Sequence, residues 1–248
     1  MLRFKQFQRL TEELNRISSQ MGSNPGGVYR DSETSEEHYI KHPYDTEHAK
    51  TEVLSSRIHE LMGLKTLNPK LISMKAGTNS ISTVMNKDME LVNKSHMNNF
   101  TDEHHKDIGT LYAAGVLTKN WDALGSGIEY GQGNLGIDKK KGNLISFDHG
   151  GSFNYRAMGG KKDYNIDIGE KDTLKDESIS EGAKIFNNSL NRPFVKKHVH
   201  QVLRNLDLKK VKGLFKDSGL NNWEELHSNF KERHKQLLKH YETENAKI

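Results

Sequence analysis

The sequence predicts an α+β protein with two lobes, a small β-rich one followed by a mostly helical one. Runs that alternate apolar and polar side chains occupy much of residues 21–90, and one clear helical pattern interrupts them. Residues 86–100 have only weak periodicity, as a hinge would, and the pattern is helical again beyond Ser178. Separate runs of strands and helices are typical of this class. We expect an N-terminal helix over residues 1–20, an N-lobe over 21–90 and a C-lobe over 91–248.

The composition limits the class of protein. The 248 residues are 33% hydrophobic, contain no cysteine and carry a net charge of +4. The absence of cysteine excludes disulfides and thiolate metal sites, and the small charge does not indicate nucleic-acid binding. The N-terminus lacks the apolar core of a secretory signal, and no run approaches the ~20 apolar residues of a membrane helix. We therefore expect a cytoplasmic protein.

The first segments predict a helix and then a hairpin. Apolar residues three or four apart over residues 2–20 predict an amphipathic helix that packs on the protein body. A membrane-surface helix is less favoured, because two glutamates interrupt its basic face. A loop with three glycines and a proline follows, and strands are expected from Val28 and over His38–Lys41. The loop's amides could contact phosphates or form a plain turn, but no Gly-Lys-Ser/Thr of a Walker A loop follows.

The clearest helix spans residues 45–64, with Asp45 or Thr46 as its cap and Gly63 at its end. Glu52 lies beside its apolar stripe, where its carboxylate can reach a lysine on a neighbouring strand, although solvent is the default for a helical glutamate. Further strands are expected over residues 67–74 and 81–85, with a turn at 76–79.

The C-lobe segments lead to two aspartates. A helix from Thr101 ends just before Asn120-Trp121-Asp122, and a glycine-rich stretch runs on to Gly136. A strand over residues 144–147 then ends at Asp148, and the glycine pair after it permits a sharp turn. Alternatively, this is an ordinary turn. Later helices are expected within residues 183–186, 194–206, 211–215 and 223–241.

Four of these residues occur in an order that resembles the protein-kinase-like fold: a strand lysine, a helix glutamate and two loop aspartates. The resemblance implies that Lys41 neutralises nucleotide phosphates and that Glu52 fixes this lysine. It also implies that Asp122 positions or deprotonates the acceptor hydroxyl and that Asp148 holds magnesium.

The details are more similar to atypical kinases than to ordinary protein kinases. Residues 22–27, 49–54, 120–122 and 148–151 resemble a set of bacterial and phage kinase-like proteins related to persistence-toxin serine/threonine kinases and phosphatidylinositol kinases. An Arg-Ala-x-Gly-Gly segment also fits this set, at residues 156–160. The resemblance implies ATP and Mg²⁺ as cofactors, and these residues as contacts to the nucleotide: Ser23, Asn24, Gly26, Gly27 and Lys41.

One position departs from the kinase pattern. The second metal-binding asparagine usually follows the catalytic aspartate by about five residues, but position 127 is glycine. Asn134 can serve only if the glycines between form an excursion that returns it to the metal. Asn120 and Asp138 are weaker substitutes. The Gly-x-Gly-x-x-Gly run over residues 131–136 is not expected to bind a dinucleotide, because no strand precedes it and no helix follows.

Other charged residues are expected to lie at the surface. The histidine pairs 104/105 and 198/200 diverge on a helix, so solvent is favoured over zinc, whereas His149 is expected to shape the site at Asp148. Lysines 139–141 are expected in an exposed turn, and Lys161 and Lys162 could meet an acidic or phosphate-bearing partner.

The sequence thus predicts an ATP- and magnesium-dependent phosphotransferase, with protein serine or threonine as the first acceptor and a lipid or small molecule behind it. Two alternatives use the same fold. One is an inactive pseudokinase that binds nucleotide or a partner, and the other is a nucleotidyl transferase.

Overall fold

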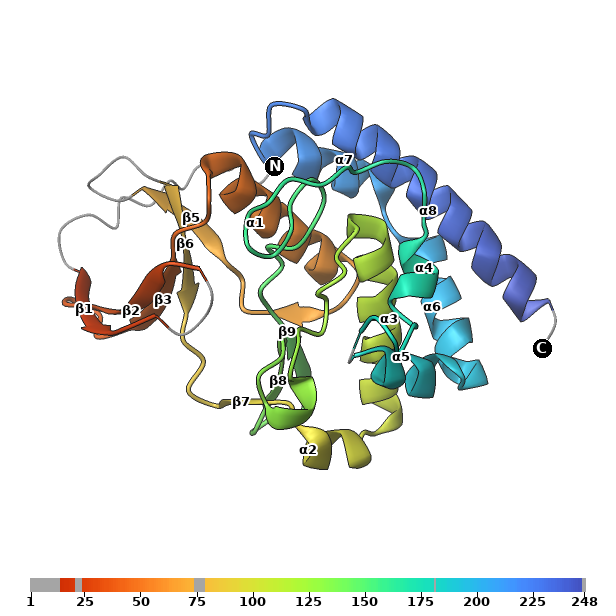
Figure 1. The fold of residues 1–248 in the computed structure, drawn as a ribbon, viewed down its shortest axis with the longest axis horizontal. Coiled ribbons are helices and arrows are strands. Elements are labelled where there is room, and N and C mark those ends of the chain that lie inside the picture. Colours follow the sequence, from red (N-terminus) through yellow and green to blue (C-terminus); the bar gives the residue numbers. More distant parts are fainter. Residues whose placement is uncertain (1–13, 21–23, 74–78, 181, 247–248) are drawn as a thin grey trace.

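The computed structural model describes residues 14–20, 24–73, 79–180 and 182–246. A β-rich region is followed by a mostly helical one, as predicted (Figure 1). The first sheet has the strand order β1-β2-β3-β6-β5, and all its neighbouring strands are antiparallel. These strands are β1 (Leu14–Ser18), β2 (Gly26–Asp31), β3 (Glu37–Lys41), β5 (Lys70–Ser73) and β6 (Asn79–Val84).

A second sheet combines strands from both of the expected lobes. Its order is β4-β9-β8-β7, in which only the β4–β9 pair is parallel. The strands are β4 (Lys65–Thr66), β7 (Met89–Leu91), β8 (Leu135–Asp138) and β9 (Leu144–Ser146). Helix α1 (Thr46–Leu61) lies between the first sheet and the helical region (Figure 1).

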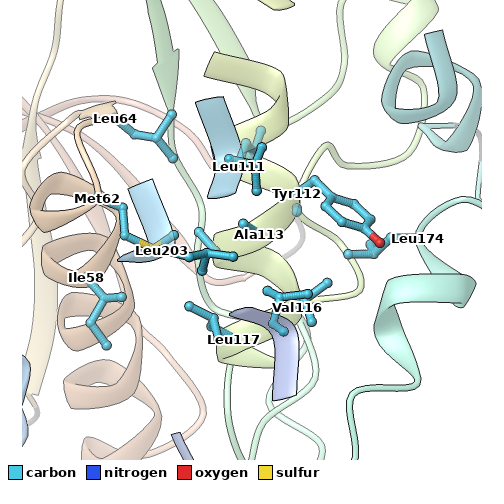
Figure 2. Close-up of a cluster of buried hydrophobic side chains, with 14 of the residues drawn as sticks. Ile58, Met62, Leu64, Leu111, Tyr112, Ala113, Val116, Leu117, Leu174 and Leu203 are labelled. Carbon is cyan, nitrogen blue, oxygen red and sulfur yellow. The ribbon is translucent and has the colours of Figure 1, made fainter. Parts of the chain in front are cut away.

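The helical region packs around α3 (Asp102–Thr118). Figure 2 shows Leu111 and Leu117 of α3 facing Ile58 and Met62, near the end of α1. One apolar cluster includes residues from α1, α3 and the C-terminal helices, so α1 is fixed to the helical region as well as to the sheet. The remaining helices are α2 (Lys94–Asn98), the 3₁₀ helix η1 (Ile128–Tyr130), α4 (Glu170–Thr173), α5 (Ala183–Leu190), α6 (Pro193–Asn205), α7 (Leu208–Asp217) and α8 (Trp223–Asn245). None of the described helices could cross a bilayer.

Local signals define the ends of the two central helices. Asp45 caps α1, because its Oδ1 accepts a hydrogen bond from the His48 amide at 2.7 Å. Thr101 caps α3 in a capping box with His104. Lys119 then adopts a left-handed conformation, with φ of 56°, which ends α3 and turns the chain into Asn120-Trp121-Asp122.

One expectation about the N-terminal half needs correction. The helix predicted over residues 2–20 is wrong for residues 14–18, which form β1, while residues 1–13 lie outside the described part. Most β1 side chains are exposed, so pairing with β2 and a hydrogen bond from Arg16 to the Gly26 carbonyl define this strand, not an apolar face. Residues 86–100, expected as a hinge, contain β7 and α2, and Asn93 caps α2; their role as a hinge stays a prediction. The turn predicted at 76–79 falls mostly outside the described residues.

The helical histidines are less exposed than expected. His105 is 7% exposed, and its Nδ1 is 2.9 Å from the Ser189 hydroxyl, so its expected placement in solvent is wrong. Burial lowers the pKa of this ring. A neutral imidazole with a partner can be buried at small cost, which spacing along a helix does not reveal.

Candidate active site

A cleft of about 680 Å³ is lined by both sheets and by α1. Apolar side chains from β6, β7 and the segments beside them line part of it, as a flat aromatic ligand would need. The same cleft is lined by five of the polar residues singled out in the sequence: Lys41, Glu52, Asp122, Asn134 and Asp148.

Lys41 is held at the end of β3, between Gly26 of β2 and Ile81 of β6. Its Nζ donates to Glu52 Oε2 at 2.8 Å and to Asp148 Oδ1 at 2.6 Å. The side chains of Lys41 and Glu52 are only 7% and 6% exposed. The expected contact between Glu52 and Lys41 is therefore confirmed, and it is a buried ion pair.

Lys41 and Glu52 each shift the pKa of the other toward its charged form. Burial alone would lower the pKa of Lys41, but the Glu52 and Asp148 carboxylates raise it above its usual value, so the ammonium stays charged. Burial raises the pKa of the Glu52 carboxyl, and the nearby ammonium opposes that shift. A charged lysine thus faces the cleft beside Asp148, whose side chain remains 43% exposed.

The turn after Asp148 brings it to Lys41. Asp148 has a φ of 53°, which aspartate tolerates better than most residues. A Cβ on Gly150 would lie 3.0 Å from Glu52 Oε2 and 3.3 Å from Lys41 Nζ. A side chain there would press on the ion pair and would require Glu52 or Lys41 to shift by a few tenths of an ångström.

Histidines hold this turn against α1. The Nε2 of His48 is 2.9 Å from the Gly150 carbonyl, and the His149 ring lies 4.1 Å from the His59 ring, between centroids. Burial lowers the pKa of His149 well below its usual value, so this ring is neutral. His149 lines the cleft, and its expected role in shaping the site stays a prediction.

Asp122 is positioned by its neighbours in the loop after α3. Its amide donates to Asn120 Oδ1 at 3.1 Å, and Asn120 is fully buried. Burial raises the pKa of the Asp122 carboxyl, and the Asp148 charge adds to the rise. Asp122 is therefore a better proton acceptor than an exposed aspartate.

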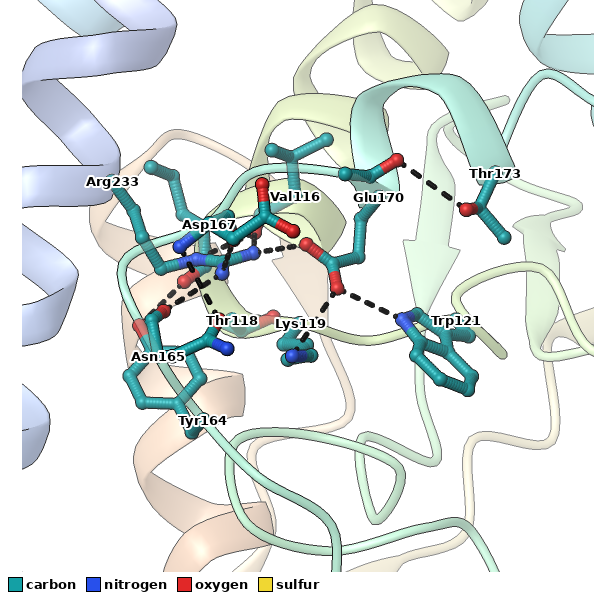
Figure 3. A network of polar contacts seen from close by, with 12 residues as sticks. Val116, Thr118, Lys119, Trp121, Tyr164, Asn165, Asp167, Glu170, Thr173 and Arg233 are labelled. Carbon is teal, nitrogen blue, oxygen red and sulfur yellow. Dashed lines mark hydrogen bonds and ion pairs between the residues drawn. The ribbon is translucent and has the colours of Figure 1, made fainter.

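Trp121 fixes the same loop to the C-terminal helix. Its Nε1 donates to Glu170 Oε1 at 3.1 Å, and Glu170 is paired with the fully buried Arg233 of α8 (Figure 3). Lys119 Nζ lies 3.7 Å from the same carboxylate. This network was not found from the sequence, because its members come from three distant segments.

Asn134 returns to Asp122 through a glycine-rich excursion. The Asn134 amide donates to the Leu124 carbonyl at 2.8 Å, and its Nδ2 donates to the Asp122 carbonyl at 2.9 Å. A Cβ on Gly133 would lie 2.4 Å from the Leu124 carbonyl oxygen, so only glycine permits this closure. The structure thus brings Asn134 beside Asp122 despite the longer spacing.

The other expected nucleotide contacts lie in or near β2. A Cβ on Gly26 would be 2.3 Å from the Ile40 carbonyl oxygen, and one on Gly27 would be 2.8 Å from the Ser18 carbonyl oxygen. Both glycines therefore allow close strand packing. Asn24 lines the cleft, and its Nδ2 donates to the Ala157 carbonyl at 3.3 Å. Ser23 lies outside the described residues.

The sequence leaves open an acidic or phosphate-bearing partner for Lys161 and Lys162. In the structure, both lysines contact groups of this chain. Lys161 Nζ donates to the Tyr155 hydroxyl, and Lys162 Nζ donates to the Lys119 and Gly151 carbonyls. Burial lowers the pKa of Lys162 to about 7. Lys162 links the Asp122 loop to the Asp148 turn, a role that no local pattern indicated.

Comparisons with known proteins identify the fold. No protein-family model and no curated protein matches the chain. Among solved structures, the chain is similar to a Helicobacter pylori proinflammatory kinase, CtkA, with a TM-score of 0.64 and 15% identity over 95% of this chain and 96% of that chain. The chain therefore has a kinase-like α+β fold, with a β-rich N-terminal region and a helical C-terminal region.

Proposed function

We propose that this protein is an ATP- and magnesium-dependent phosphotransferase that acts on protein serine or threonine. The observation that carries the proposal is the convergence of Lys41, Glu52, Asp122, Asn134 and Asp148 on one cleft in a kinase-like fold. The serine or threonine acceptor follows from the resemblance to atypical kinases.

The residues present fit a magnesium ion that is shared with phosphates. Asp148 offers a half-exposed carboxylate, and none of the described residues donates to Asn134 Oδ1. Mg²⁺ prefers such oxygen ligands and commonly takes one or two from protein. Within the described segments, no three acidic or histidine side chains form a metal cage, which also fits a metal that is completed by a nucleotide. Bound there, the metal would neutralise phosphate charge.

Each polar residue then has a role set by its surroundings. Lys41 would bind phosphate oxygens, and Glu52 would hold the ammonium in place from its buried position. Asp122 would orient the acceptor hydroxyl and take its proton, which its raised pKa favours. Lys162 would keep the two loops together through its carbonyl contacts.

The placement of Asn134 favours an active enzyme over a pseudokinase. A pseudokinase could lose the second metal ligand at no cost, whereas this chain uses Gly133 and the bond to Asp122 to hold Asn134 at the cleft. We therefore prefer transfer over nucleotide binding alone.

The proposal is tested by phosphate transfer from labelled ATP to the protein itself and to proteins of a cell extract, with magnesium or with a chelator. Asp122→Asn should keep ATP affinity within a few fold and lower transfer about 10²–10⁴-fold, the usual contribution of a general base. Equal transfer by both proteins would remove Asp122 from the mechanism. No transfer by the wild type with any divalent metal would favour the pseudokinase.

A further inference from the structure

An exposed tryptophan stands beside the proposed catalytic aspartate. Trp121 is 44% exposed although Glu170, which is 4% exposed, holds its indole N–H at 3.1 Å (Figure 3). The acid is itself paired with buried Arg233, so the indole edge is anchored while much of the ring stays open to solvent. Anchored, exposed aromatic rings are common centres of binding surfaces.

Arg156 adds an available charge to this ring. Its guanidinium carbon lies 5.8 Å from the Trp121 ring centroid, and its side chain is exposed. Across the described residues, no carboxylate forms an ion pair with Arg156. In contrast, Lys119 lies 3.7 Å from Glu170 and Lys161 lies 3.8 Å from Asp45. A guanidinium that rests over an aromatic ring is well placed to take a carboxylate.

The backbone fixes Arg156 near the cleft. Its amide donates to the Gly160 carbonyl at 2.7 Å, and its carbonyl accepts from the Gly159 amide at 2.9 Å, which closes a tight turn. A Cβ built on Gly151 would lie 3.6 Å from the Ala157 nitrogen and 3.7 Å from Asp122 Cβ. Residue 157 and Asp122 therefore flank the same point, and both line the cleft.

We infer that Trp121 and Arg156 form a docking surface for the acceptor protein and select a segment with an acidic side chain close to the reacting hydroxyl. The acceptor role rests on the proposed function, whereas the preference for an acidic segment rests on the surface itself. The lysines nearby have partners of their own. Lys119 and Lys161 lie within 4 Å of carboxylates. Lys162, whose Nζ lies 5.4 Å from the Trp121 ring centroid, donates to two carbonyls. Among these four residues, Arg156 alone has no such partner. Its positive charge therefore makes the surface suitable for an acidic segment.

Peptide binding tests the inference without requiring transfer. The probes are a short fluorescein-labelled peptide with a serine between glutamates, and a twin with glutamines in their place. Fluorescence anisotropy compares wild type, Arg156→Gln, Arg156→Lys and Lys216→Gln. Lys216 is a matched control, since it is an exposed cation on α7, a helix that contributes no residue to the cleft.

We expect the wild type to bind the acidic peptide about ten-fold more tightly than its twin, as for one charge-assisted contact. Arg156→Gln should remove most of that preference, Arg156→Lys should keep part of it, and Lys216→Gln should keep all of it. Equal binding of the two peptides, or no binding of either, would overturn the inference. A preference that survives Arg156→Gln, or is lost in Lys216→Gln, would also overturn it by placing the acidic segment on another basic surface.

The outcome is separable from the proposed function. If the wild type transfers no phosphate yet shows the Arg156-dependent preference, the docking surface stands and the phosphotransferase proposal fails. If transfer occurs without this preference, the reverse holds.

Discussion

Removing the Lys41 ammonium should destabilise the fold more than removing any exposed lysine. In Lys41→Met, the Glu52 carboxylate, 6% exposed, would lose its cation at 2.8 Å. Breaking one side of a buried pair costs about 3–5 kcal/mol. Asp148 also loses its contact, but water can solvate it because it is 43% exposed. We therefore expect the lower end, about 3 kcal/mol.

Urea unfolding followed by circular dichroism measures this loss. Lys87→Met is the matched control: Lys87 is 72% exposed and lies 3.6 Å from Glu37, so its loss should cost under about 1 kcal/mol. The double variant Lys41→Met/Glu52→Met should recover most of the lost stability, because no buried charge is left without a partner.

The stability lost in Lys41→Met should also depend on pH. Burial raises the pKa of Glu52 above its unfolded value, and without Lys41 nothing at 2.8 Å opposes that shift. Such a group contributes its stability fully below the unfolded pKa and loses it as pH rises through the folded pKa. The deficit of Lys41→Met should therefore be larger near pH ~8 than near pH ~5. A single variant no less stable than Lys87→Met, or a double variant as unstable as Lys41→Met alone, would refute the reasoning.

Three further variants test the rest of the site. Asp148→Asn should abolish the effect of magnesium on ATP affinity, measured by titration calorimetry. It should change the free energy of unfolding by under about 1 kcal/mol, because asparagine tolerates the positive φ. An unchanged magnesium effect would contradict the assignment of Asp148 as a metal ligand. Gly133→Ala should weaken the magnesium effect, because its Cβ would lie 2.4 Å from the Leu124 carbonyl oxygen. Gly142→Ala, whose Cβ meets nothing within 4 Å, should leave the magnesium effect unchanged. Equal weakening in the two variants would argue against the glycine-rich excursion. Glu170→Leu should cost about 3 kcal/mol in urea unfolding because Arg233 is fully buried, and a loss below about 1 kcal/mol would show that the network is not a buried anchor.

The features predicted correctly from the sequence depend on neighbours along the chain. The β2–β3 hairpin follows from alternation, and α1 follows from its cap at Asp45. The Lys41–Glu52 pair joins a strand end to the next helix, eleven residues on, so its geometry follows from two local predictions. The roles assigned to Asp122 and Asp148 came from the resemblance and remain proposals.

The features that were missed depend on distant contacts. Arg233 and Glu170 are 63 residues apart, and no periodicity connects them. β1 is an edge strand whose backbone pairing is not encoded in its apolar spacing. The tight fit at Gly150 is visible only once α1 and β3 place two charges beside it. The glycine-rich excursion to Asn134 could be proposed but not established, because closure depends on the exact path of the loop.

The anchor of Trp121 has a consequence for the order of events during synthesis. Arg233 belongs to α8, so the loop that carries Asp122 lacks its buried anchor until α8 has been synthesised. The elements that hold Lys41 emerge much earlier, since β2, β3 and α1 all precede residue 62. A chain that ends before Arg233 can thus assemble the part of the cleft that holds Lys41 while the Asp122 loop lacks its contact to α8. α8 thus links the synthesis of Arg233 to the anchoring of the Asp122 side of the cleft.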